Sequence, residues 1–310
     1  MTCANRGGIC MRITKLAGTT ALCTMAVLGI TGTKAFADTV SPAGWTMNLP
    51  VAVVLPGGLY FADTGYYMNR QSGIGRVDAE VNLPTLVWST PWDFLGGHVE
   101  AIAAVPELSV GDHTAGVSDT SFYNAAALIG EVWNLGSGWS VSEFAGAFFP
   151  VNTDVGQLGI GGNFWTFTDL AGIAYNTTDG WSLGANFTLG ISGNNASYGY
   201  QTQPDTIDVD FSAVKHIDKW ELGLVGNAST DISNTVGNDY GNYRYSQVAL
   251  GGLVGYTFGS VTAEVFATRS VLANNQAPLS LGGPDTRVWG RIIIPLWNPP
   301  APAAPVVAKY

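Results

Sequence analysis

The sequence is poor in cysteine, in charge and in long hydrophobic runs. All three cysteines, Cys3, Cys10 and Cys23, fall within the first 37 residues. The rest of the chain can therefore form neither a disulfide nor a thiolate metal site. Charged residues make up 12% of the chain, against about 25% in an average soluble domain. Beyond residue 37 no apolar run reaches the length of about 18 residues that a transmembrane helix needs.

Basic residues are scarcer than acidic ones. Of 13 lysines and arginines, four (Arg6, Arg12, Lys15 and Lys34) precede residue 38, whereas none of the 23 acidic residues does. Residues 38–310 thus carry nine basic and 23 acidic side chains, a net charge of −14. Because binding to phosphate backbones needs a basic surface, we expect no nucleic-acid partner.

The first 37 residues have the pattern of an export signal. Arg12 and Lys15 precede an apolar stretch, Leu16–Ile30, and Ala35-Phe36-Ala37 has the small-x-small form of a cleavage site. We predict cleavage after Ala37, with translation starting at Met1 or Met11. An uncleaved anchor is the alternative, but the apolar stretch is short for a membrane span.

Glycine is abundant instead, with 40 residues, and the apolar residues are spread by alternation. From Trp181 to Ser192, six apolar side chains alternate with Ser, Gly, Asn, Thr, Gly and Ser. Successive side chains of a strand point to opposite faces, so this pattern predicts a ribbon with one apolar and one polar face. The pattern recurs along the chain, and a tilted transmembrane strand needs about 9–11 residues.

Short turns, such as Leu135–Gly138 and Phe258–Ser260, tend to alternate with longer polar segments, such as Arg70–Asp78 and Ser109–Ser121. This asymmetry is typical of outer-membrane barrels. We therefore predict an all-β fold: a single transmembrane antiparallel up-and-down β-barrel of about 12 strands (12–14), with short periplasmic turns and long extracellular loops. The predicted organisation is a signal peptide at 1–37, a lead-in at 38–57, the barrel at 58–297 and a Pro-rich tail at 298–310.

Aromatic residues gather at the ends of the predicted strands. Their apolar rings and polar groups suit a membrane–water interface, although aromatic residues in an ordinary core are the alternative. The predicted interfacial girdle comprises Tyr60, Tyr67, Trp139, Trp181, Trp220, Tyr256 and Trp297.

Charged and amide side chains fall on the polar face of several predicted strands. An ion facing hydrocarbon costs several kcal/mol, about 2–4 for arginine at the bilayer centre, so these side chains should face the lumen. Lining an open pore and pairing within a filled, narrow barrel are both consistent with this pattern. The predicted lumen-lining residues are Asn186, Thr188, Asp208, Asp210, Glu221, Asn227, Glu264, Arg287 and Arg291.

No pattern of catalytic or metal-binding residues stands out. The three histidines are His98, His113 and His216, and only His98, which shares a strand face with Glu100, suggests a general base or a metal ligand. No metal-ligand spacing and no nucleophile-elbow motif occurs. We expect no catalytic residue, no metal and no cofactor.

Several short segments resemble a known family. Pro56-Gly57-Gly58-Leu59-Tyr60-Phe61 with Tyr66-Tyr67, Ala174-Tyr175 with Asp179-Gly180-Trp181, Trp220–Gly226 and Arg291–Trp297 are similar to the "meta-pathway of phenol degradation" family of outer-membrane transporters. Gln201–Pro204 and the Pro-rich end depart from its pattern. The resemblance implies an exported barrel that passes hydrophobic or aromatic compounds, and it brings no site residues.

The leading hypothesis is an outer-membrane channel for passive uptake of small, hydrophobic or aromatic solutes. Its expected partners are outer-membrane lipids, the solute and the outer-membrane assembly machinery. A structural or adhesive barrel with a plugged lumen is the first alternative. A secreted β-sandwich binder and an outer-membrane enzyme are further alternatives.

Overall fold

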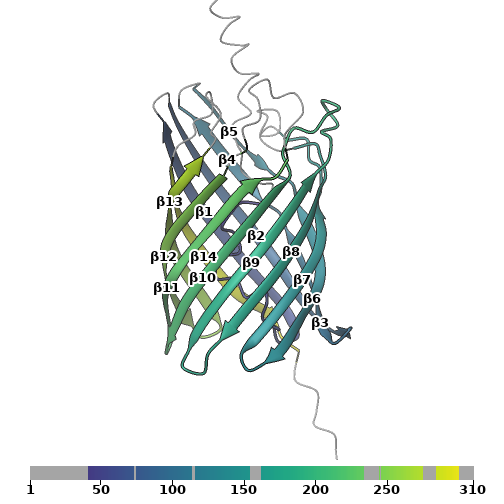
Figure 1. Ribbon diagram of the computed structural model, residues 1–310, viewed down its shortest axis with the longest axis vertical. Coiled ribbons are helices and arrows are strands. Elements are labelled where there is room, and N and C mark those ends of the chain that lie inside the picture. Colours follow the sequence, from purple (N-terminus) through teal and green to yellow (C-terminus); the bar gives the residue numbers. More distant parts are fainter. Residues whose placement is uncertain are drawn as a thin grey trace, which may run out of the picture.

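The chain folds into a closed antiparallel β-barrel (Figure 1). The computed structural model describes residues 41–72, 75–113, 116–153, 162–233, 244, 246–274 and 284–299. The predicted signal peptide and the Pro-rich tail lie outside these residues, apart from positions 298–299 of the tail. The strands are β1 (Gly58–Ser72), β2 (Gly75–Phe94), β3 (Gly97–Ala104), β4 (Glu107–Asp112), β5 (Val117–Phe122), β6 (Ala126–Gly136), β7 (Trp139–Phe148), β8 (Thr166–Asn176), β9 (Trp181–Ser192), β10 (Thr206–Ile217), β11 (Trp220–Asp231), β12 (Ser246–Phe258), β13 (Val261–Asn274) and β14 (Asp285–Trp297).

These 14 assigned strands build a barrel of 12. The long β2 pairs with β3 through its second half and with β4 through its first half, so β3 and β4 form one strand of the wall. β5 and β6 continue each other in the same way. Pro106 has no amide hydrogen and stands where β3 passes into β4, which explains this interruption. β1 pairs with both β2 and β14 and closes the barrel. The predicted fold class is confirmed.

Side chains alternate between a buried inner face and an exposed outer face. On β9, Trp181, Leu183, Phe187 and Ile191 are exposed, while Asn186 and Thr188 are buried. In water this arrangement would leave a broad apolar band uncovered. In a bilayer it matches the hydrocarbon, and a closed barrel leaves no strand edge facing lipid. Among the described residues no helix is long and apolar enough to cross a membrane.

Short turns lie at one end of the barrel, at the bottom of Figure 1. They connect β6 to β7, β8 to β9, β10 to β11 and β12 to β13. In the β8–β9 turn, the Thr177 hydroxyl and Lys215 lower the pKa of Asp179.

Two expected loops were wrong in extent. β1 and β2 run into 70–78, and β4 and β5 occupy most of 109–121, because strand pairing extends the wall there.

Candidate functional site: the barrel interior and its inner segment

The interior of the barrel is occupied by the segment that precedes β1. Residues 41–55, which we call the inner segment, form successive tight turns, with hydrogen bonds such as Trp45 N–H to Pro42 O and Met47 N–H to Gly44 O. Side chains from β1, β2, β3, β9, β10, β13 and β14 contact it. Because these strands surround the barrel axis, the inner segment lies within the lumen.

Asp210 of β10 holds the first turn of the inner segment. Its carboxylate accepts hydrogen bonds from the Gly44 amide at 2.8 Å, the Thr46 amide at 2.8 Å and the Thr46 hydroxyl at 2.6 Å. Asn186 of β9 donates to the Thr46 carbonyl at 2.9 Å. Gly44 has a φ of +99°, and a Cβ there would meet Met47 and the Trp289 ring within 3.0 Å. The turn therefore needs glycine.

Two arginines of β14 bind backbone carbonyls of the same segment. Arg291 donates to the carbonyls of Trp45, at 2.8 Å, and Met47. It also donates to the Thr64 hydroxyl at 2.9 Å and pairs with Glu264 at 3.0 Å. Arg287 donates to the Ala43 carbonyl at 2.9 Å and pairs with Asp285 at 2.9 Å. Both guanidinium groups are buried but multiply hydrogen-bonded, as a buried charge must be.

Asn48 of the inner segment forms further hydrogen bonds with two glutamates of the wall. The Asn48 side chain donates to Glu264 at 2.8 Å and to Glu221 at 3.4 Å. The charged residues that bind polar groups of the inner segment are thus Asp210, Glu221, Glu264, Arg287 and Arg291, on β10, β11, β13 and β14.

The other end of the inner segment is held at Leu55. Its amide donates to Glu100 of β3 at 3.1 Å, and its carbonyl accepts from the Ser89 hydroxyl of β2 at 2.9 Å. Ser89 Oγ lies 2.9 Å from His98 Nε2, and His98 Nδ1 lies 3.1 Å from Asp93.

The remaining part of the inner wall is apolar. Three side chains of the inner segment pack in an apolar cluster with β2, β3 and β6 to β8. Trp45 is buried in this cluster, and Val51 and Val54 pack against it as half-buried side chains. The wall members of that cluster are Leu83, Ile102, Ala104, Ala126, Leu128, Val132, Phe144, Phe148 and Leu170. Met47 packs against a second cluster that includes Tyr66, Phe266 and Trp289. The interior is therefore two-sided, with an ionic sector and an apolar sector.

The residues predicted from the strand pattern to line the lumen lie on the inner side of the wall. Those that are buried are Asn186, Thr188, Asp208, Asp210, Asn227, Glu264, Arg287 and Arg291, and Glu221 is half-buried. Six of them directly contact the inner segment at the distances given above: Asn186, Asp210, Glu221, Glu264, Arg287 and Arg291. Asp210 and Asn227 are cross-strand neighbours, as are Asp208 and Thr188.

Most of the predicted girdle residues are exposed on the outer face. Trp139, Trp181 and Trp220 lie beside the short turns, and Trp297 ends β14. Trp220 packs edge-on against Tyr256 with ring centroids 4.7 Å apart. Tyr67 is exposed toward the opposite end of β1. Tyr60 is an exception. It shares the strand face of buried Ala62, and its hydroxyl donates to the Pro56 carbonyl at 2.6 Å.

Sequence reasoning missed three features. The lead-in was not recognised as lumen-filling, although its apolar residues and three prolines, Pro42, Pro50 and Pro56, suit a compact non-strand segment. Ser89 was not singled out, because a lone serine in an alternating strand carries no signal. Glu143 and Asp169 face outward from the neighbouring strands β7 and β8 and lie close enough to interact electrostatically.

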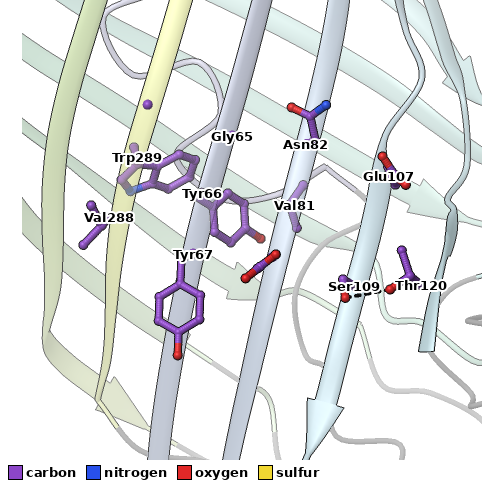
Figure 2. A pocket seen from close by; sticks show the side chains of 12 residues that line it. Gly65, Tyr66, Tyr67, Val81, Asn82, Glu107, Ser109, Thr120, Val288 and Trp289 are labelled. Atoms are coloured by element: carbon purple, nitrogen blue, oxygen red, sulfur yellow. Dashed lines mark hydrogen bonds between the residues drawn. The ribbon is translucent and has the colours of Figure 1, made fainter. Parts of the chain in front are cut away.

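A hollow of about 640 Å³ marks the outer wall where β14, β1, β2, β4 and β5 lie side by side (Figure 2). Gly65 and Gly290, paired across β1 and β14, leave its centre without side chains. Asn82, Glu107 and Ser109 lie at its rim. The apolar outer band is thus interrupted by polar groups at this place.

Within the described ranges no group of three or more His, Cys, Asp or Glu side chains could hold a metal ion.

A closed 12-stranded barrel with an apolar outer band is an outer-membrane β-barrel. The family model described as "Putative MetA-pathway of phenol degradation" matches residues 53–280. The chain belongs to this family, and the resemblance seen in the sequence is confirmed.

Comparison with solved structures finds one that shares the fold and others with lower similarity. The chain is similar to the COG4313 outer membrane channel from Pseudomonas putida F1, with a TM-score of 0.64 and 12% identity, over 77% of this chain and 96% of that one. It also matches a Pseudomonas aeruginosa FadL homologue, with a TM-score of 0.44 and 8% identity, over 86% and 96% of the two chains. No curated protein matches the chain.

Proposed function

We propose that the protein is an outer-membrane channel for the passive uptake of small, hydrophobic or aromatic solutes, and that it acts without catalysis. The observation that carries the proposal is the apolar sector of the inner wall, with Leu83, Ile102, Leu128 and Phe148 facing inward. Barrels that conduct hydrophilic solutes have polar interiors. An apolar inner wall offers a solute that partitions out of water a favourable surface along the barrel.

The family description supports an aromatic solute, since it names phenol degradation. The Pseudomonas putida relative is described as an outer membrane channel. Outer-membrane lipids and the outer-membrane assembly machinery are the other partners that we propose.

Passage of a solute requires the inner segment to shift, since it packs against both sectors of the wall. The hydrogen bonds that hold this segment to Asp210 and Arg291 favour a second candidate function, a structural or adhesive barrel whose lumen stays filled. The two candidates differ in whether uptake depends on movement of the inner segment.

A reversible cross-link between the segment and the wall tests this difference. Cleavage of the predicted signal after Ala37 would remove all three native cysteines. The pair Thr46→Cys/Asp210→Cys would then supply the only thiols of the mature chain. The side-chain oxygens of these residues lie 2.6 Å apart, so we expect the two introduced thiols to form a disulfide on oxidation, and a gel-shift assay with a maleimide confirms it. The matched control is Thr257→Cys/Thr262→Cys, whose hydroxyls lie 3.1 Å apart on neighbouring wall strands.

The readout is entry of the hydrophobic fluorophore N-phenylnaphthylamine into Gram-negative cells that express each variant. We expect oxidation to abolish the uptake mediated by the Thr46/Asp210 pair, reductant to restore it, and the control pair to transport in both states. Fluorophore entry equal to that of cells without the protein, for every variant, would contradict the channel and favour the filled barrel.

A further inference from the structure

Three side chains near the β2–β3 hairpin form a chain of polar contacts that ends on the inner segment. Asp93 is exposed at this hairpin, His98 is one-fifth exposed, and Ser89 is buried. The contacts are Asp93 Oδ1 to His98 Nδ1 at 3.1 Å, His98 Nε2 to Ser89 Oγ at 2.9 Å, and Ser89 Oγ to the Leu55 carbonyl at 2.9 Å.

Acid, base and hydroxyl are spaced here as in a hydrolytic triad. The placement of Ser89 opposes that function. The residue is only 1% exposed, and its hydroxyl lies on the Leu55 carbonyl, so an acyl substrate has no approach to it. The contacts instead connect a titratable imidazole to the backbone of the inner segment.

The number of protons decides which of these contacts can form together. Ser89 has one hydroxyl proton, and the Leu55 carbonyl can only accept. A neutral imidazole that donates from Nδ1 to Asp93 has a lone pair at Nε2, and this lone pair competes with Leu55 for the Ser89 proton. The other neutral tautomer, protonated at Nε2, is disfavoured because its Nδ1 lone pair would face the Asp93 carboxylate at 3.1 Å. An imidazolium donates from both nitrogens, so Ser89 keeps its proton for Leu55. Only the protonated imidazole satisfies all three contacts.

We propose that Asp93, His98 and Ser89 form a proton-controlled latch, which holds the inner segment at Leu55 when His98 is protonated and releases it when His98 is neutral. The proposal concerns the seating of the segment and does not depend on which solute the barrel passes.

Other charged groups near the latch must be separated from its effect. Glu100 of β3 faces the same Leu55 peptide and accepts its amide hydrogen. Tyr60 of β1 lies close enough to Glu100 to interact electrostatically with it. From β6, the cross-strand neighbour of His98 is the apolar Val132. Acid protonation of Glu100 would weaken its bond to Leu55, opposite to the latch, so a Glu100→Gln background isolates the histidine.

A nitroxide spin label at Val53→Cys, in the full-length protein purified into micelles, reports the seating of the segment. Imidazole side chains titrate within pH 5 to 8. In the Glu100→Gln background we expect the ratio of mobile to immobile label to rise about fivefold as the pH rises through this range. A change of that size corresponds to the loss of one net hydrogen bond.

Three variants define the outcome. His98→Gln carries an amide that donates to Ser89 at every pH, so the label should stay immobile. Ser89→Ala lacks the hydroxyl, so the label should be mobile at every pH. His113→Gln, altered at an exposed histidine near the opposite end, is the matched control and should retain the pH response. A pH response that persists in His98→Gln, or is missing from the Glu100→Gln background itself, would overturn the proposal.

Discussion

Arg291 of β14 lies in register with Glu264 of β13, and their buried side chains form an ion pair of 3.0 Å. Neither charge reaches water, so each depends on the other and on the inner segment. Arg291 also donates to the carbonyls of Trp45 and Met47. This pair therefore connects the closure of the barrel to the filling of its interior.

The first prediction concerns Arg291. Replacing it with methionine leaves Glu264 buried without its partner, and this should lower the free energy of unfolding by about 3–5 kcal/mol. Urea unfolding of the refolded protein in lipid vesicles measures it. Arg269→Met is the control, because Arg269 is exposed on the same β13 strand as Glu264 and donates only to Thr286 among the contacts seen. Equal losses in the two variants would show that the ion pair adds nothing.

The second prediction concerns Gly44. Alanine at this position is disfavoured by the positive φ, and its Cβ would clash with the Trp289 ring. Gly44→Ala should therefore displace the inner segment and leave the wall intact. We expect faster proteolysis within residues 41–55 together with normal heat-modifiable migration on unboiled gels. Gly57→Ala is the control, since a Cβ there meets nothing within 4 Å. Identical proteolysis of both variants would count against a required glycine.

A third test is a double-mutant cycle between Thr46→Val and Asp210→Asn. The hydroxyl–carboxylate bond of 2.6 Å is buried and charge-assisted, so the coupling energy should be about 1–3 kcal/mol. Thr46→Val combined with Asp179→Asn, in an exposed turn, should be additive within about 0.5 kcal/mol. Additivity in the first cycle would mean that Asp210 does not hold the turn through Thr46.

The outward carboxyl groups of Glu143 and Asp169 allow a fourth prediction. On a lipid-facing surface, acidic side chains destabilise a barrel, and two carboxyl groups that lie close together disfavour each other's charge. The double variant Glu143→Leu/Asp169→Leu should raise the free energy of unfolding in vesicles, by an amount on the order of 1 kcal/mol. Ala145→Leu, a volume change on the same face of β7, should have a smaller effect. A loss of stability in the double variant would indicate that this face meets something other than lipid.

The fifth prediction concerns export. Cleavage after Ala37 gives a purified protein that starts at Asp38, and N-terminal sequencing or intact mass measures this directly. Ala37→Pro should block processing and leave the longer chain, because proline disrupts the small-x-small site. Ala43→Ser, a small change at a buried position inside the barrel, is the control and should leave processing unchanged. A mature chain that starts elsewhere would move the boundary of the signal.

The wall of the barrel could be predicted from the sequence because its signal is local. Alternation along Trp181–Ser192 predicts which side chains are exposed on the outer face, and most of these are exposed. The inner residues Asp210 and Arg291 were found in the same way, since charge on one parity of a strand must face inward.

What those inner residues bind could not be predicted, because their partners are remote in sequence. Gly44 and Asp210 are 166 positions apart, and no local pattern joins them. Strands β4 and β5, in a stretch expected to be a loop, were missed for a related reason. Pro106 reads as a turn signal, yet the neighbouring long strand β2 holds both halves in one wall.

The inner segment directly precedes β1, and β1 is the strand that closes the barrel against β14. The barrel thus closes only when β14 has been synthesised, whereas the inner segment is synthesised before all the wall strands. If the barrel closed first, its inner arginines and carboxylates would lack the backbone groups of residues 41–55 that they bind, and the segment would have to pass through the narrow lumen to reach them. Insertion into the membrane should therefore capture the segment while the β1–β14 seam is still open, so that its docking becomes a step in the assembly of the barrel.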